Sequence, residues 1–295
     1  MLLYIAFRIM LFFLYLMPFR LIYVFSDFTA FLLHKVIKYR KDVVYNNLSK
    51  SFPQKTKKEI KKYAAKFYRN FSDVMLESGK GYITNPKKIK KRYVFSNVEI
   101  LNQYYENGKS IILQMGHFNN WEWLGMTLSY DVFHKIFAIY RPLKNRRIDA
   151  YIKKAREKRQ FNIVPMANTG LMFRNIAKQP CIFVLISDQS PTQSDKAYWT
   201  YFLNQETGFL HGTEIYSKKF KLPIVFAKVI RIKRGYYKID FIPIADENDL
   251  KQEGKATINY AKMLEKTIIE QPTSWLWSHR RWKRERPKDK EILEF

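Results

Sequence analysis

The sequence predicts an α/β fold in which a mainly parallel or mixed central sheet is flanked by helices and follows a hydrophobic, helical N-terminal region. Two observations carry this prediction. Short runs of β-branched, aromatic and aliphatic residues alternate with amphipathic segments over residues 111–230, as in successive βαβ units. The start of the chain, over positions 1–40, is instead apolar and then basic. We therefore expect two regions, a membrane-associating helical region at 1–50 and one α/β domain at 51–295.

The N-terminal region is the most hydrophobic part of the chain. Its apolar run begins at once and no small-residue cleavage site follows, unlike a signal peptide. Arg8, Pro18 and Arg20 interrupt it, and the uncharged run is about half of the roughly 20 residues that a spanning helix needs. Basic residues follow at 35–40 and 55–66. This order favours a membrane-embedded or interfacial anchor over the alternative, a buried helix pair with a solvated basic face.

Helical spacing of apolar residues predicts a helix over residues 51–80, with Pro53 near its start and Gly79 and Gly81 at its end. A short basic stretch at 86–92 separates it from the region of strands. Five apolar runs then predict buried strands, at residues 111–115, 136–140, 162–166, 182–186 and 222–230.

Two further elements complete the domain. The run at 236–245 is expected to pair with the preceding strand as an antiparallel hairpin around Arg234 and Gly235. A final helix is expected over 257–271, followed by a tail at 272–287 that is rich in Trp and Arg.

Composition restricts the classes of function. The 295 residues carry 53 Lys+Arg against 26 Asp+Glu, a net charge of +27, and 47% of them are hydrophobic. Such an apolar content excludes a disordered basic tail, and the charge implies an acidic partner: nucleic acid, anionic lipid or an acidic protein. The single cysteine, Cys181, excludes internal disulfides and a thiolate zinc cluster.

Polar residues follow three of the predicted strands. His117 comes after Gly116, Arg141 follows the second strand directly, and Asp188 comes after Ser187. Because the carboxyl ends of parallel strands share one edge of a sheet, these side chains are expected to lie together there.

The strongest local pattern is GHFNNWEW at 116–123. Asn119 or Asn120 can cap the helix that follows, which puts Glu122 in its first turn. The carboxylate of Glu122 could then bind one nitrogen of His117, fix the tautomer, and leave the other nitrogen to accept a proton. The alternatives are that Glu122 completes a capping box and that His117 is a hydrogen-bonded turn residue.

The sequence contains no obvious nucleophile, no Gly-x-Ser-x-Gly elbow, no phosphate-binding Gly-rich loop and no metal-ligating His pair. Cys181 is expected to be a small core residue. A lone base suits direct acyl transfer to a hydroxyl, with amides at the helix start and a nearby Arg as donors to the developing negative charge. Neither a metal nor a cofactor is expected.

At this point the chain resembles a known family, the late acyltransferases of lipid A biosynthesis (lauroyl and myristoyl transferases), within the lysophospholipid acyltransferase superfamily. GHFNNWEW matches the His-x4-Asp/Glu block of membrane glycerolipid and lipid A acyltransferases. Further blocks in the family's order lie at residues 40–53, 139–159, 185–190 and 272–287.

The resemblance implies an acyl chain transferred from acyl carrier protein to a hydroxyl of a Kdo2-lipid IVA-type precursor. It implies His117 as general base, Glu122 as its partner, and Arg141, Arg156 and Asp188 as substrate-binding or organising residues. It implies the cytoplasmic face of the inner membrane of a Gram-negative bacterium, with peripheral or single-pass attachment. The partners would be acyl carrier protein, anionic lipids and the lipid A precursor, rather than nucleic acid.

Several alternatives stay open. Residues 190–214 match the family loosely, since Phe202, Leu203 and Asn204 stand where Phe-Phe-Gly is usual, so the acceptor could be another membrane lipid, a glycerolipid or a hydroxylated aminolipid. Trp275, Trp277, Trp282, Arg280 and Arg281 could form an interfacial belt or headgroup site, or a packed tail. A surface arginine, a solvated helix face and a turn cap are the simpler interpretations of Arg141, Arg156 and Asp188. A non-enzymatic protein that binds membranes or nucleic acid is disfavoured, because the basic residues are scattered.

Overall fold

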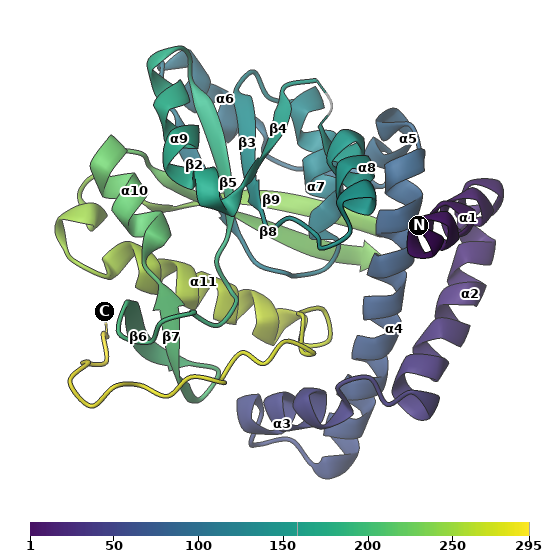
Figure 1. Ribbon diagram of the computed structural model, residues 1–295. Helices are drawn as coiled ribbons and strands as arrows, with labels where there is room; N and C mark the ends of the chain where they lie inside the picture. Colours follow the sequence, from purple (N-terminus) through teal and green to yellow (C-terminus); the bar gives the residue numbers. More distant parts are fainter. Residues whose placement is uncertain (158, 295) are drawn as a thin grey trace.

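The computed structural model describes residues 1–157 and 159–294; Lys158 and Phe295, the last residue of the expected domain, lie outside them. Within the described residues, a seven-stranded sheet forms the centre of the molecule (Figure 1). Its strands, in spatial order, are β1 (Tyr93–Phe95), β9 (Tyr236–Ala245), β8 (Ile224–Lys233), β2 (Ile111–Met115), β5 (Cys181–Ile186), β3 (Lys135–Tyr140) and β4 (Phe161–Pro165).

The sheet is mostly parallel. The strands from β8 to β4 all run in one direction, while β9 returns antiparallel to β8 and β1 lies parallel to β9. The five strands and the β8–β9 hairpin predicted from sequence are confirmed, with Gly235 at positive φ in the turn. The three-residue β1 was not predicted, because a run that short carries no periodicity. Paired registers such as Met115 with Ile186 bring the carboxyl ends of the central strands to one edge.

Helices cover both faces of the sheet. One hydrophobic cluster joins β2, β8 and β9 to α5 (Pro86–Lys90), α6 (Glu99–Glu106) and α7 (Trp121–Thr127). On the opposite face, clusters join the strands to η4 (Phe173–Ala177) and α11 (Lys255–Glu270). The remaining elements of the domain are η2 (Leu128–Tyr130), α8 (Arg146–Arg156), η3 (Met166–Asn168), α9 (Thr169–Met172), α10 (Gly212–Phe220) and η5 (Asp249–Lys251).

The helix expected over residues 51–80 is wrong in its bounds. The structure has α3 (Lys41–Ser51) and α4 (Lys57–Ile83), and α4 begins at a capping box formed by Thr56 and Glu59. Gly79 and Gly81 do not end α4 but lie inside it. They allow close packing, because a Cβ at Gly81 would lie 2.7 Å from the sulfur of Met126. Glycine inside a helix therefore marks close helix contact here and not a helix end.

The N-terminal region is a helical hairpin of α1 (Leu2–Leu16) and α2 (Phe19–Phe31), continued by η1 (Leu32–Val36). It packs along α4 as the outermost layer of the molecule (Figure 1). Among the described residues, no helix is long and apolar enough to cross a bilayer. The membrane association expected for residues 1–50 stays a prediction, as does the division at residue 50.

The segment that departs from the family pattern, residues 190–214, contains structure of its own. It forms a separate antiparallel hairpin of β6 (Ala197–Phe202) and β7 (Gln205–Leu210). Leu203 and Asn204 both have positive φ in its two-residue turn, which is typical of tight hairpins. The hairpin packs beside α11 and carries Phe202 and Phe209 into the core.

Candidate active site

His117 lies in a tight turn between β2 and α7. Gly116 is needed at the end of the strand, because a Cβ there would lie 2.8 Å from Leu264 and 3.1 Å from the carboxylate of Asp188. Asn119 turns the chain at a φ of 50°. Asn120 is the cap of α7, and its side chain accepts a hydrogen bond from the backbone N–H of Trp123 at 3.2 Å. The sequence pattern therefore predicted the turn and its capping type correctly.

The carboxylate that binds His117 is Asp188. Nδ1 of His117 lies 2.6 Å from Oδ1 of Asp188, and the backbone N–H of His117 donates to Oδ2 at 2.7 Å. The expectation that Glu122 would contact the imidazole is wrong. The register of β2 and β5 brings the loop after β5 directly beside Gly116, so the carboxylate of Asp188 lies against the imidazole. With Nδ1 engaged, Nε2 is the ring nitrogen left for chemistry.

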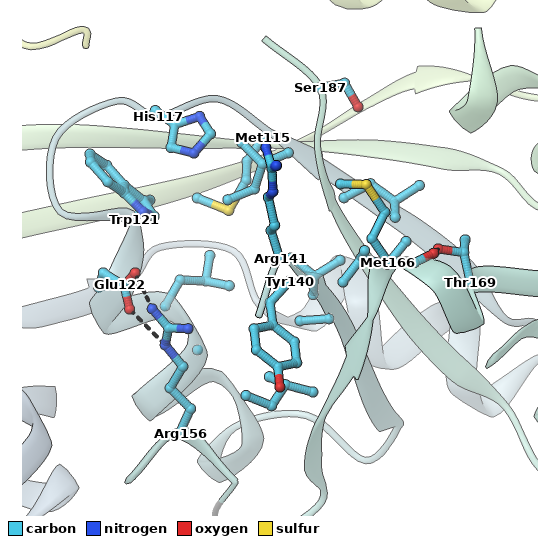
Figure 2. Close-up of a pocket in the computed structure, with 18 of the residues that line it drawn as sticks. Met115, His117, Trp121, Glu122, Tyr140, Arg141, Arg156, Met166, Thr169 and Ser187 are labelled. Atoms are coloured by element: carbon cyan, nitrogen blue, oxygen red, sulfur yellow. Dashed lines mark hydrogen bonds and ion pairs between the residues drawn. The ribbon is translucent and has the colours of Figure 1, made fainter. Parts of the chain in front are cut away.

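Glu122 forms a second ion pair with Arg156 of α8. Nε of Arg156 lies 3.0 Å from Oε2 and Nη2 lies 2.5 Å from Oε1, a two-pronged contact that fixes both side chains. The hydroxyl of Tyr82 donates to Oε2 at 3.3 Å. Because Glu122 binds Arg156, it does not complete a capping box, and Arg156 is not on a solvated face. Figure 2 shows this pair on the same wall as His117 and Trp121.

Burial and charge set the protonation of the central pair. Burial opposes a proton on His117, but the carboxylate of Asp188 outweighs it, so the pKa of His117 is raised above its ordinary value of 6.5. Burial would raise the pKa of Asp188, but His117 and the indole N–H of Trp275 hold it below 3.8. Asp188 is therefore a carboxylate that favours an imidazolium beside it.

A cavity of about 690 Å³ opens in front of His117. His117, Glu122, Arg141 and Arg156 all line it, whereas Asp188 lies behind the imidazole and is only 2% exposed. Figure 2 shows the guanidinium of Arg141 extending toward His117 across the cavity. Much of the remaining lining is apolar and includes Leu124, Gly125, Ala138, Ile152, Phe161, Ile163, Val184 and Ile186.

The structure thus brings together the five residues singled out from the sequence, but His117 pairs with Asp188 and Glu122 pairs with Arg156. Their chemical roles stay predictions. Sequence reasoning missed Tyr82 and Glu77. Glu77 is fully buried on α4 and accepts hydrogen bonds from Asn120 at 2.8 Å and from Tyr237 at 2.7 Å, so it supports the start of α7. The signal that could have revealed it is the i,i+4 spacing of Asp73 and Glu77.

Comparisons with known proteins identify a family and several related proteins. Residues 1–284 match the family described as bacterial lipid A biosynthesis acyltransferase. The chain is 21% identical over 249 residues to a lipid A biosynthesis palmitoleoyltransferase of Escherichia coli, covering 84% of this chain and 80% of that protein. It is 24% identical over 259 residues to a lipid A biosynthesis acyltransferase of Haemophilus influenzae, covering 87% and 81%. A lipid A biosynthesis acyltransferase of Shigella flexneri is 21% identical, with 84% and 80% covered.

Proposed function

Because the chain belongs to the bacterial lipid A biosynthesis acyltransferase family and is therefore an acyltransferase, we propose that it transfers a fatty acyl chain from acyl carrier protein to a hydroxyl of a Kdo2-lipid IVA-type precursor. The observation that carries the proposal is the His117–Asp188 pair, whose imidazole lines a largely apolar cavity. The names of the related proteins support lipid A as the acceptor.

His117 acts as the general base in this proposal. Nε2 takes the proton of the acceptor hydroxyl as its oxygen attacks the thioester carbonyl. The tetrahedral intermediate then collapses, the C–S bond breaks, and the departing thiolate takes the proton from His117. Asp188 holds the tautomer and stabilises the transient imidazolium, which replaces the role that the sequence pattern gave to Glu122.

Arg141 and the Glu122–Arg156 pair have separate tasks. The guanidinium of Arg141 extends toward His117 and is placed to donate hydrogen bonds to the oxyanion or to an acidic group of either substrate (Figure 2). Glu122 and Arg156 are fixed by each other and line the cavity wall, so they orient the acceptor without exchanging protons with it.

The apolar part of the cavity suits the acyl chain. Ala138, Ile163 and Phe161 line it along β3 and β4, while Gly125 of α7 faces them. The cavity has a volume of about 690 Å³. A thioester carbonyl at His117 therefore leaves room for the hydrocarbon to enter the core.

The N-terminal hairpin is the proposed membrane contact, in a peripheral arrangement at the cytoplasmic face of the inner membrane. More than half of the exposed large hydrophobic side chains of the described structure lie within residues 1–37. Exposed Arg20, Lys35 and Lys38 accompany them and suit anionic headgroups. Exposed apolar side chains that concentrate in one region are typical of an interaction or membrane-contact surface.

Acyl carrier protein is the proposed donor because a chain of net charge +27 favours acidic partners. The assay offers purified protein Kdo2-lipid IVA with acyl carrier protein thioesters or with matched coenzyme A thioesters. We expect transfer from the former, and a loss of at least about 10²-fold in His117→Ala, the low end for removal of a general base.

Lipid mass spectrometry separates the acceptors. In a deletion strain, we expect lipid A to lack one acyl chain, with restoration by the wild-type chain and not by His117→Ala. Intact lipid A together with a lost chain on another membrane lipid would reassign the acceptor. Full activity of a folded His117→Ala protein would remove the base from the mechanism.

A further inference from the structure

The segment Pro272–Trp282, here called the C-terminal clamp, contacts the catalytic turn through its backbone. The N–H of Asn119 donates to the carbonyl of Ser274 at 2.9 Å. Phe118 and Trp275 form an antiparallel bridge. Both contacts lie immediately beside His117 in the turn. The turn that presents the imidazole is therefore held by a segment from the far end of the sequence.

The side chain of Trp275 contacts the other member of the pair. Its indole N–H donates to Oδ2 of Asp188 at 2.8 Å, and the residue is 2% exposed. Its ring packs edge-on against Trp277, Phe202 and Trp282, with centroids 4.9, 5.9 and 6.0 Å apart. The indole is thus locked by packing, and its N–H has a fixed direction toward the carboxylate.

The clamp then holds the loop that carries Asp188. Nε2 of His279 accepts a hydrogen bond from the backbone N–H of Ser190 at 3.0 Å. The buried guanidinium of Arg281 donates to the carbonyl of Gly208 at 2.7 Å and stacks on Phe209. One short segment therefore joins the His117 turn, the Asp188 loop and the β6–β7 hairpin.

We infer that Trp275 is a positioning residue of the acyl-transfer reaction, which fixes Asp188 and the adjoining turn so that Nε2 of His117 faces the cavity. The inference rests on the proposed function. The Trp-rich tail is then a packed structural segment and not an interfacial belt. The indole N–H groups of its tryptophans all donate to protein acceptors, as in Trp275, Trp277 and Trp282.

Within the described structure, three donors act on the carboxylate of Asp188: two from His117 and one from Trp275. Without the indole N–H, the negative charge would be shared by fewer donors and the carboxylate would hold the proton on His117 more tightly. It would also lose one of its fixed contacts. The titratable and charged groups around His117 in the described part of the chain are Glu122, Arg141, Arg156, Asp188, Tyr260, His279 and Arg281.

The test compares two indole deletions in the same segment. Trp275→Phe keeps an aromatic ring and removes the N–H that binds Asp188. Trp277→Phe removes an N–H that binds the carbonyl of Pro272 at 2.6 Å. We expect kcat of Trp275→Phe to fall roughly 10-fold to 100-fold, the range for a hydrogen bond to a charged group, with KM for the donor within about 2-fold. The pH below which kcat/KM falls, called the acid limb of the pH profile, should be higher in this variant, because His117 must lose its proton to act as base.

Trp277→Phe should keep the acid limb of the wild type. Trp275→Phe combined with Asp188→Asn should lose little more than Asp188→Asn alone, since the partner of the indole is already altered. If Trp275→Phe fails to fold, Trp275→Met, with a large and flexible apolar side chain, carries the same test.

An unchanged acid limb and kcat in folded Trp275→Phe would overturn the inference, as would an equal limb shift in Trp277→Phe. Failure of the proposed function looks different: wild-type protein would transfer no acyl chain, or His117→Ala would remain active.

Discussion

The N-terminal hairpin at residues 1–37 and the C-terminal clamp are similar in composition and opposite in orientation. Both are rich in aromatic and basic residues, and the sequence allowed a membrane-interface role for both. The hairpin exposes its rings, with Phe25 and Phe28 about half exposed. The clamp buries Trp275 and Trp277 almost completely. Polar side chains bind inward in both regions: Ser26 donates to the buried Asp73, and Trp275 donates to the buried Asp188.

The difference shows that aromatic and basic content alone does not decide whether a segment exposes or buries its rings. What separates the two regions is which side chains carry the polar groups. In the hairpin, Tyr23, Ser26 and Asp27 all bind α4 or the β8–β9 turn, which leaves mainly apolar groups outward. In the clamp, the indoles themselves supply the polar groups, so the rings must face inward. Substitutions in each region would break or preserve this contrast in different ways.

Asp188→Asn should give the largest loss, because the clamp contacts the pair to which we assign the chemistry, and the hairpin does not. We expect kcat to fall by about 10² to 10⁴, as an amide cannot stabilise the imidazolium or secure its tautomer. The raised pKa of His117 places the acid limb above 6.5 in the wild type. The residual activity should have its limb at lower pH, since loss of the carboxylate lets His117 release its proton more easily. Vesicle binding should be unchanged, and a kcat near that of the wild type would contradict the assignment.

Asp73→Asn tests how firmly the hairpin is attached. Asp73 is fully buried and binds Arg231 at 2.5 Å and Arg234 at 2.7 Å. Breaking such a buried pair leaves charge uncompensated, and we expect a loss of about 3–5 kcal/mol in the free energy of unfolding. Asp27→Asn is the matched control, because Asp27 binds the same Arg234 but is 43% exposed and should cost about 1 kcal/mol or less. Denaturant unfolding measures both, and equal losses would show that burial is not decisive.

Replacing Phe25 and Phe28 by Asp should weaken membrane binding without touching catalysis. Each ring buried in the interface contributes roughly 1.5–3 kcal/mol, so each change should lower vesicle partitioning by about 10-fold or more. Flotation with anionic vesicles measures the effect, and kcat in detergent micelles should stay within about 2-fold. Tyr201→Asp, at an exposed aromatic on β6, is the control and should leave flotation intact. An equal loss of flotation in the control variant would show that the added negative charge, and not the position of the ring, weakens vesicle binding.

Gly125→Ala should give the smallest effect, a change in acyl-chain preference. An added Cβ would lie 3.1 Å from the ring of Phe161 and push it toward the cavity. We expect the preferred chain to shorten, with several-fold changes in relative kcat/KM, while Phe161→Ala should favour longer chains. Competition between acyl carrier protein thioesters of different length, followed by mass spectrometry, measures both. Shifts in the same direction would place the hydrocarbon elsewhere.

The sequence predicted the strands because apolar runs that alternate with amphipathic segments are a local signal. It predicted the functional edge of the sheet because polar residues directly follow three of those runs. Strand ends grouped His117, Arg141 and Asp188, the local motif added Glu122, and the family resemblance added Arg156. The sequence assigned the wrong carboxylate to His117, because the short spacing from His117 to Glu122 was visible in sequence. The contact with Asp188 depends instead on the pairing of β2 with β5.

Other errors have the same origin. Two glycines close together are typical of a helix end. Gly79 and Gly81 lie inside α4 instead, because Leu14 and Met126 pack closely against the helix at these positions. The buried position of Trp275 likewise depends on a bridge to Phe118, which lies much earlier in the chain. Long-range pairing decides such features, and no local pattern reports it.

The bridge between Phe118 and Trp275 also has a consequence for the order of events during synthesis. The apolar hairpin is made first, and Trp275 follows only near the other end of the chain. At roughly 5–20 residues per second, this interval is on the order of 10 to 50 s. Once made, the turn at His117 lacks the segment that holds it until Trp275 is synthesised, so the proposed membrane contact is complete before the proposed active site.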